Sequence, residues 1–181
     1  YSLNGANFKL ITAQGEFAVQ SPLLGHFNVE NLLASLVSAE QAGFDLAALI
    51  AVVAQLKGAP GRMQVIRDAE RLFVVDYAHT PDALTQVLKT LKRHVTQNLW
   101  AVFGCGGDRD RGKRPLMTQA ALEEADVALL TSDNPRTENP EQIFADMKNG
   151  ITFSTHLVHE IHDRREAIKF AVKNAQAGDI V

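Results

Sequence analysis

The sequence contains only one cysteine, Cys105, in 181 residues. A single cysteine excludes an internal disulfide framework. The sequence also lacks an apolar run close to the roughly 20 residues that a membrane helix needs, and no signal-like segment is visible at its start. These absences predict a cytoplasmic protein without a membrane partner.

An excess of positive charge is absent as well. The formal net charge is -3, with 46% hydrophobic and 22% charged residues, which is ordinary for a globular protein. This balance argues against non-specific binding to nucleic acid. The six histidines are scattered and do not form the spacing of a zinc site. We therefore expect no nucleic acid among the partners and no metal ligands.

The first 60 residues predict two strands followed by two helices. Residues 7–20 read as two strands around a turn, and the first helix should start at Asn28. A second helix, over residues 46–56, should be N-capped by Asp45 and ended by Gly58. The apolar residues expected along one side of the first helix are Leu32, Leu33, Leu36 and Val37.

A linker rich in glycine and proline, Gly58–Arg62, precedes a regular alternation of strands and helices. This alternation predicts an α/β fold, with a mostly parallel sheet and helices on both faces. The final Gly178–Val181 should begin a further strand at an unfinished edge, so we expect a fragment that holds the tail of one domain and most of another. The expected strands lie at about 71–76, 98–103, 127–132 and 156–160, and the expected helices at about 81–94, 114–125, 140–149 and 163–177.

Three loops at predicted strand ends carry candidate binding residues, because open α/β sheets bind ligands at the carboxyl ends of their strands. In the first loop Asp76 closes the strand, and Thr80 and Pro81 form the expected N-cap and first residue of a helix. Asp76 could accept hydrogen bonds from ribose hydroxyls, and His79 could meet a phosphate. Equally, both side chains could satisfy only backbone groups of the loop.

The second loop, Gly104–Pro115, combines glycines with basic residues. Glycines let the backbone approach a ligand closely, and positive charge near a helix start favours anions. The loop has neither the residue order of a P-loop nor the G-x-G-x-x-G fingerprint. The combination favours ligand binding over a solvated turn. The residues concerned are Gly104, Gly106, Gly107, Arg109, Arg111, Lys113 and Arg114.

The third loop carries Asp133, Asn134, Pro135 and Arg136 directly after an apolar run. A carboxylate suits an ammonium group, an amide both donates and accepts, and a guanidinium matches a carboxylate. This set fits the head of an amino acid. In isolation it would read as a turn set by Pro135, but its place beside the other two loops favours binding.

Five segments occur in the order and approximate spacing of the Mur ligase family, which the sequence resembles from about residue 25 to its end. The joint presence of the last three is highly specific. Within the family the sequence is most similar to ligases that add meso-diaminopimelate to UDP-N-acetylmuramoyl-L-alanyl-D-glutamate. The segments are GHFNVENLLAS, GRMQVI, VVDYAHTPDAL, VFGCGGDRDRGKRP and TSDNPR.

The resemblance implies an assignment of domains and of binding residues. Residues 1–60 would be the C-terminal end of a central ATP-binding domain, and residues 61–181 a Rossmann-like domain that receives the incoming amino acid. By the family's motifs, the residues near ATP would be Asn28, Asn31, Arg62, Asp76 and His79. Those that bind meso-diaminopimelate would be Arg109, Asp133, Asn134, Pro135 and Arg136.

The resemblance also implies a reaction in peptidoglycan precursor synthesis. ATP would phosphorylate the γ-carboxylate of D-glutamate, and the diaminopimelate amine would attack the acyl phosphate, with Mg²⁺ neutralising charge. The family's P-loop, magnesium-binding carboxylates and carbamylated lysine would precede this segment, and a KGHE motif would follow it. We therefore expect no catalytic or metal-binding residue in these 181 residues and no activity from them alone.

Other functions stay open at this point. A lysine-adding Mur ligase or a folylpolyglutamate synthetase would share the D-x-A-H loop, although neither is expected to carry D-N-P-R. A different class of protein, a non-catalytic module for a nucleotide or an amino acid, also fits a sequence without a P-loop.

Overall fold

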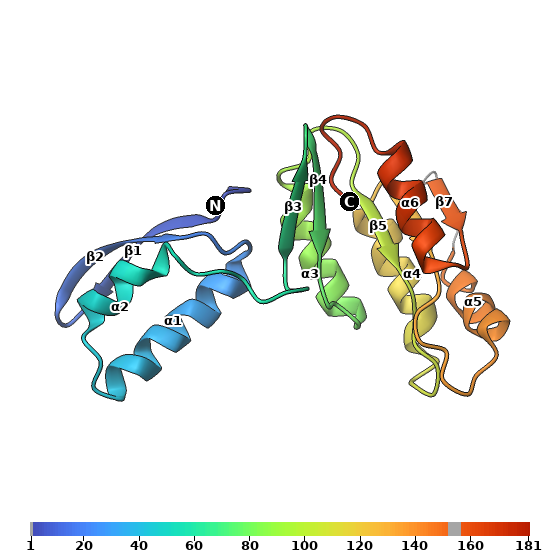
Figure 1. Cartoon of the computed structure of the whole chain (residues 1–181). Coiled ribbons are helices and arrows are strands. Elements are labelled where there is room, and N and C mark those ends of the chain that lie inside the picture. The colour runs from blue at the N-terminus through green and yellow to red at the C-terminus, as the bar shows by residue number, and fades with distance from the viewer. Residues whose placement is uncertain (1, 152–156) are drawn as a thin grey trace. The chain divides into compact units, whose positions relative to one another are not determined.

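The computed structural model describes residues 2–151 and 157–181 and divides the chain into two compact units, Tyr1–Gln64 and Val65–Val181. Figure 1 shows a hairpin with two helices in the first unit and an α/β arrangement in the second. Among the described residues, no helix is long and apolar enough to cross a membrane.

The first unit is a β-hairpin with one apolar face. Its strands β1 (Ala6–Thr12) and β2 (Gly15–Ser21) pair antiparallel, with Ala6 opposite Ser21 and Thr12 opposite Gly15. Because side chains alternate along a strand, every second residue faces the helices α1 (His26–Gln41) and α2 (Leu46–Val53). The core formed in this way contains Phe8, Leu10, Phe17, Val19, Leu32, Leu36, Leu46 and Val53.

The two predicted strands of this unit and the cap of its second helix are confirmed. The Asp45 carboxylate accepts a hydrogen bond from the backbone N–H of Ala48 at 2.8 Å. The prediction for Val37 was wrong, since its side chain is 55% exposed. Helical geometry explains this, because consecutive residues point about 100° apart and Val37 directly follows the buried Leu36.

Two predicted helix boundaries in this unit were also wrong. The first helix already begins at His26 and not at Asn28. The second ends at Val53, before Gly58, because the next backbone N–H groups form tighter turns. Gln55 N donates to Val52 O at 3.0 Å, and Leu56 N donates to Val53 O at 3.1 Å.

The second unit is built on strands in the order β3, β4, residues 179–181, β5, β6, β7. β5, β6 and β7 pair in parallel, and Ile180 forms parallel bridges to Leu72 of β4 and to Leu99 beside β5. A mostly parallel sheet was predicted and is confirmed. The strands are β3 (Gln64–Asp68), β4 (Arg71–Val75), β5 (Trp100–Phe103), β6 (Val127–Leu130) and β7 (Leu157–Glu160).

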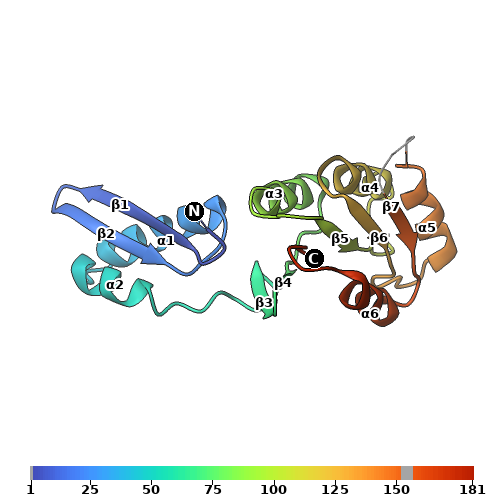
Figure 2. The same ribbon diagram turned by 90° about the horizontal axis from the view of Figure 1, so that it is seen from above.

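Helices cover both faces of this sheet, as predicted. In Figure 2, α3 (Pro81–Lys92) and α4 (Lys113–Glu124) lie on one face and α6 (Arg164–Asn174) on the other. α5 (Pro140–Lys148) packs next to α4. On the side of α6, Trp100, Val127 and Leu129 pack with Ala167, Ala171 and Ala175.

Two predictions for this unit need correction. β3 was not expected, because its segment Gln64–Asp68 holds only two apolar residues and its side chains are mostly exposed. The final segment was expected at an unfinished edge, but Ile180 is paired on both sides. Residue 156 of the fourth predicted strand lies outside the described residues.

A buried carboxylate holds the segment 179–181 between its neighbours. Asp179 is 1% exposed, and its Oδ1 accepts from the backbone N–H of Asn98 at 2.9 Å. Its Oδ2 accepts from Nε1 of Trp100 at 3.0 Å and from the backbone N–H of Gln176 at 2.8 Å. The carboxylate therefore joins the last strand to β5 and to the end of α6.

Replacing Asp179 with alanine should lower the free energy of unfolding by roughly 2 to 4 kcal/mol. Hydrogen bonds to a charged group contribute about 1.5 to 3 kcal/mol, and the buried donors would be left without a partner. Urea unfolding followed by Trp100 fluorescence would measure the loss. Asp179→Asn should lose less, and Glu123→Ala, which removes an exposed carboxylate on α4, should lose almost nothing. Equal stability of all three variants would contradict the role of Asp179.

Candidate functional site

The candidate site lies at the carboxyl edge of the sheet in the second unit. β4, β5 and β6 run parallel to residues 179–181 or to one another, so the loops that follow them leave the same edge. The three predicted loops, which occupy residues 76–80, 104–112 and 131–139 in the structure, are therefore brought to one side of the sheet. Ligands of open α/β sheets bind at this edge.

The second and third loops are joined directly through Gly107. Its backbone N–H donates to the carbonyl of Asn134 at 2.9 Å, and its own carbonyl accepts from Nη1 of Arg136 at 2.5 Å. Next to it, the Asp108 carboxylate accepts from Oγ1 of Thr137 at 2.8 Å. The Gly-rich and D-N-P-R segments thus form one structural element.

This close approach requires glycine at two positions. A Cβ atom on Gly107 would lie 1.8 Å from the carbonyl oxygen of Pro135, and one on Gly104 would lie 2.3 Å from that of Thr131. Both obstacles are backbone atoms, which cannot turn away as a side chain can. Any larger residue would therefore separate the two loops.

Two side-chain-bearing residues of the joined loops adopt left-handed backbone conformations. Asp108 has a φ of 51° and Arg136 a φ of 49°. Such conformations cost energy for residues other than glycine and are concentrated at functional sites. The turn at Arg136 is stabilised locally, since its N–H donates to Oδ1 of Asn134 at 3.1 Å.

A buried arginine lies beneath the joined loops. Arg114 is 1% exposed, and its Nη2 donates to Oε1 of Glu138 at 2.7 Å and to the Gly106 carbonyl at 3.3 Å. Its Nη1 donates to Oδ2 of Asp146 at 2.7 Å. Arg111 also pairs with Asp146, at 2.9 Å from Nε. We refer to Arg111, Arg114, Glu138 and Asp146 as the Arg114 cluster.

The pairing in the Arg114 cluster keeps its carboxylates ionised. The hydrogen bond from Arg111, with those from Gln142 and Arg114, holds the pKa of Asp146 well below its usual range. The hydrogen bond from Arg114 likewise lowers the pKa of Glu138. Two cations face two carboxylates, so the cluster offers no surplus charge to a ligand.

This pairing corrects part of the sequence interpretation. Arg111 and Arg114 were expected to bring positive charge for an anion, but both are engaged by carboxylates of the protein. Glu138, at the end of the third loop, and Asp146, on α5, were not predicted from the sequence. The sequence indicated them only by their negative charge, which could pair with the basic residues within 109–114.

The remaining residues predicted to bind the amino acid are accessible. Arg109 is exposed and has no hydrogen bond or ion pair with any residue that the structure describes. Asp133 is exposed too. Burial raises the pKa of the nearby Cys105 thiol to about 11; the charge of Arg114 opposes this effect, and the charge of Asp133 adds to it. Cys105 is therefore a neutral thiol and not a nucleophile.

In the first loop, the predicted residues contact their own backbone. Oδ1 of Asp76 accepts from the N–H of Ala78 at 2.8 Å, and Nδ1 of His79 lies 3.0 Å from the Tyr77 carbonyl oxygen. The helix that follows is capped as expected, since Oγ1 of Thr80 accepts from Ala83 N at 3.3 Å. His79 itself is exposed at the same edge as the other loops.

Three further predicted residues belong to the first unit. Asn28 and Asn31 lie one turn apart on α1, and Nδ2 of Asn28 donates to the Leu24 carbonyl at 2.7 Å. Asn31 and Arg62 are exposed. Arg62 lies in the linker, where its N–H donates to the carbonyl of Ala59 at 3.1 Å.

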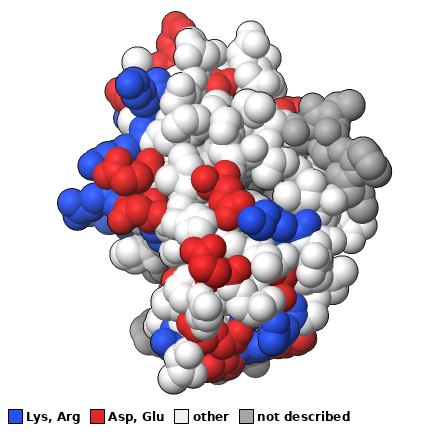
Figure 3. All heavy atoms as spheres, turned by 90° about the vertical axis from the view of Figure 1, so that its right-hand side faces the viewer, with Lys and Arg blue, Asp and Glu red and all other residues white. Residues whose placement is uncertain are grey.

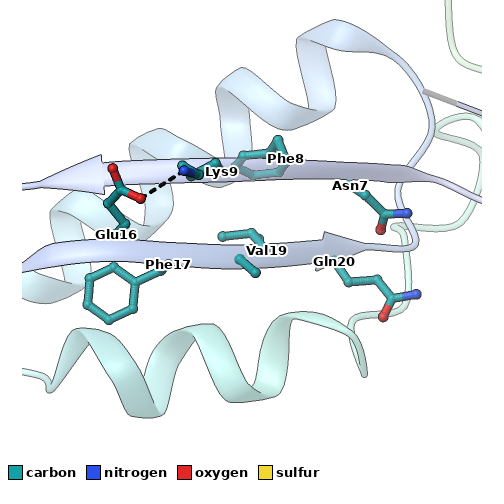
Figure 4. Close-up of a pocket in the computed structure, with 8 residues that line it drawn as sticks. Asn7, Phe8, Lys9, Glu16, Phe17, Val19 and Gln20 are labelled. Atoms are coloured by element: carbon teal, nitrogen blue, oxygen red, sulfur yellow. Dashed lines mark hydrogen bonds and ion pairs between the residues drawn. The ribbon is translucent and has the colours of Figure 1, made fainter.

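An open groove of about 730 Å³ lies on the hairpin of the first unit, away from every predicted site residue. Figure 4 shows its wall formed by both strands, with Lys9 and Glu16 paired across them at 2.8 Å. The groove offers one neutralised ion pair and no convergent set of polar groups. It therefore carries no functional assignment.

No metal centre is apparent in the part of the chain that the structure describes. There, His, Cys, Asp and Glu side chains form no group of three that could hold a metal ion. On the face drawn in Figure 3, basic and acidic side chains lie next to one another without a large area of one sign.

The lowered pKa of Asp146 predicts how stability depends on pH. A carboxylate whose pKa is lower in the folded state stabilises the fold above its unfolded pKa of about 3.9 and loses this contribution as pH falls. The free energy of unfolding should therefore decrease between about pH 5 and pH 2.

The Asp146→Asn variant should be less stable at pH 7 but should depend less on pH over this acidic range. Urea unfolding at several pH values would measure both effects. Glu123→Gln, which removes an exposed carboxylate outside the cluster, should keep the wild-type slope. A slope unchanged in Asp146→Asn would contradict the pairing.

A family model described as "Mur ligase, glutamate ligase domain" matches residues 61–181. The UDP-N-acetylmuramoyl-L-alanyl-D-glutamate–2,6-diaminopimelate ligase of Geobacillus thermodenitrificans (strain NG80-2) is 46% identical over 178 residues. The match covers 98% of this chain and 36% of that relative, so the chain spans about a third of the relative's length.

Solved structures show the same relationship. A structure of a UDP-N-acetylmuramoyl-L-alanyl-D-glutamate–2,6-diaminopimelate ligase is 78% identical with a TM-score of 0.70, covering 100% of this chain and 37% of that one. The folylpolyglutamate synthase of Thermotoga maritima has a TM-score of 0.75 at 19% identity, covering 99% of this chain and 41% of that one, which is a likeness of fold alone. With the family model matched along the whole second unit, the chain belongs to the Mur ligase family.

Proposed function

We propose that this chain is the amino-acid-accepting part of an ATP-dependent ligase. The complete enzyme would join meso-diaminopimelate to UDP-N-acetylmuramoyl-L-alanyl-D-glutamate, forming an amide bond in peptidoglycan precursor synthesis. The observation that carries the proposal is the 78% identity, over the whole chain, with the solved ligase of that name. The joined Gly-rich and D-N-P-R loops support it independently.

The proposal assigns the two parts of the chain different roles. Residues 1–60 would be the end of the central ATP-binding domain, and residues 61–181 the C-terminal domain that receives the amino acid. The complete enzyme would act in the cytoplasm. The free thiol of Cys105 supports a reducing compartment.

The chemistry of the third loop suits meso-diaminopimelate. This substrate has an amino-acid head at each end, and therefore carboxylates and ammonium groups that need opposite charges. Arg136 and Arg109 provide guanidinium groups for the carboxylates, Asp133 provides a carboxylate for an ammonium group, and Asn134 can serve either. Pro135 sets the turn between Asn134 and Arg136, as its fixed φ allows.

Five residues are proposed to meet ATP by their place in the family's motifs. Asn28 and Asn31 would lie near adenine, Asp76 would accept from ribose hydroxyls, and Arg62 and His79 would approach the nucleotide. ATP would supply the phosphoryl group that activates the acceptor carboxylate, and Mg²⁺ would neutralise phosphate charge. The proposal assigns the ligands of Mg²⁺ to the rest of the complete enzyme.

The Asp76→Ala variant tests the nucleotide assignment in the complete enzyme. A hydrogen bond to a ribose hydroxyl is worth roughly 0.5 to 1.5 kcal/mol, so KM for ATP should rise about threefold to tenfold. Steady-state phosphate release at varied ATP would measure the change. Asp82→Ala, which removes an exposed carboxylate nearby on α3, should leave KM unchanged. An unchanged KM in a folded Asp76→Ala variant would remove Asp76 from the site.

The Arg136→Ala variant tests the substrate assignment. Lysine lacks the second carboxylate of diaminopimelate, so only diaminopimelate should depend on this guanidinium. We expect kcat/KM for meso-diaminopimelate to fall at least about a hundredfold, because a site built around a polar group loses heavily when the pairing is broken. The residual activity with lysine should fall far less, and KM for ATP should change little.

Amino-acid-dependent phosphate release with each substrate would measure these effects in the complete enzyme. Arg165→Ala, which removes an exposed cation from α6, is the matched control and should behave as wild type. An equal fall in kcat/KM for both amino acids would show that Arg136 stabilises the loop and does not bind the second carboxylate. Wild-type enzyme that prefers lysine would overturn the proposed substrate.

A further inference from the structure

We propose that Arg114 is a positioning residue for the amino-acid substrate. From its buried place it would hold the second and third loops in the arrangement from which Arg136 and Arg109 bind the substrate carboxylate. The inference rests on the proposed function and adds to it a residue that cannot itself reach the ligand, since Arg114 is 1% exposed.

The contacts of Arg114 reach three separate segments. Its Nη2 bonds the Gly106 carbonyl in the second loop at 3.3 Å and Glu138 after the D-N-P-R turn at 2.7 Å. Its Nη1 bonds Asp146 on α5 at 2.7 Å. A planar guanidinium presents its donors in a fixed geometry, so these bonds set the relative position of the three segments.

The link from Arg114 to Arg136 passes through one peptide group. The carbonyl of Gly106 and the N–H of Gly107 belong to the same planar unit. Arg114 donates to the Gly106 carbonyl of this unit. The Gly107 N–H of the same unit donates to the Asn134 carbonyl at 2.9 Å. The next carbonyl, that of Gly107, accepts from Nη1 of Arg136 at 2.5 Å. A shift of this peptide would therefore move the guanidinium of Arg136.

Glu138 supplies a second link. Its Oε1 accepts both from Arg114 and from the backbone N–H of Asp108 at 2.5 Å. Asp108, held in a left-handed conformation, in turn accepts from Thr137 in the third loop. The Glu138 carboxylate thus links the same two loops a second time, through Asp108.

Stability alone is a poor explanation for a cation at this place. Arg114 lies in the first turn of α4, where the helix dipole disfavours positive charge, and burial removes its hydration. Buried ion pairs of this kind are often no more stabilising than apolar side chains of similar volume. The geometry that they impose on the loops is the property that an apolar residue could not supply.

The test compares Arg114→Lys with wild type in the complete enzyme. Lysine keeps the charge, but its donors share one nitrogen at the end of a flexible stem, so it does not fix the three segments in the geometry that the planar guanidinium imposes. KM for meso-diaminopimelate should rise at least about tenfold, because a misplacement of about 1 Å can cost up to a hundredfold. KM for ATP should stay within about twofold, and the preference for diaminopimelate over lysine should shrink by a similar factor of about ten.

Arg111→Gln is the matched control. It removes a cation from the same cluster and a partner of the same Asp146, but Arg111 has no bond to Gly106 or Glu138. This variant should keep wild-type KM values and selectivity. Glu138→Gln, which retains an acceptor for Asp108, should show a smaller loss than Glu138→Ala in the same direction as Arg114→Lys.

The outcomes separate the two proposals. If wild-type enzyme uses meso-diaminopimelate but folded Arg114→Lys keeps its KM and selectivity, the positioning role is wrong while the function stands. Equal losses for diaminopimelate, lysine and ATP would indicate general damage and also overturn it. If wild type does not use diaminopimelate at all, the proposed function itself fails. Thermal unfolding and circular dichroism would confirm folding, and a selective loss restricted to diaminopimelate would support the inference.

Discussion

Backbone hydrogen bonds on both sides of Ile180 hold the sheet of the second unit together. Val181 N donates to the Leu72 carbonyl at 2.8 Å, and Trp100 N donates to the Ile180 carbonyl at 2.8 Å. Without this segment, β4 and β5 would have no paired neighbour between them. The loop that begins at Asp76 could then not share an edge with the Gly-rich and D-N-P-R loops, so the place of this first loop in the candidate site depends on the pairing.

Within the site, the positive charges divide into two groups by their surroundings. Arg111 pairs with Asp146, and Arg114 pairs with Asp146 and Glu138. These pairs connect the second and third loops to α5. Arg109 is left exposed, and the described residues offer the Arg136 guanidinium only the carbonyl of Gly107. The buried end of the arginine-rich loop is thus neutralised by carboxylates, while its exposed end can still offer cations to a ligand.

Features set by neighbouring residues were the ones that the sequence predicted well. Asp45 and Thr80 cap their helices because a short polar side chain reaches an N–H three residues ahead. The predictions failed where the apolar pattern of the sequence was weak or ambiguous. β3 has little apolar character, and the exposed Val37 follows a buried leucine so closely that a list of apolar residues could not separate the two sides of α1.

The sequence by itself determined the alternation of strands and helices, and with it the placement of three loops at strand ends. Only the tertiary structure decided which of the charged residues in those loops pair with one another. Glu138 and Asp146 lie 24 and 32 residues from Arg114, and Asp179 lies 79 residues from Trp100. Such pairs depend on the path of the chain and on burial, because a charge excluded from water must find its partner wherever the fold has brought one.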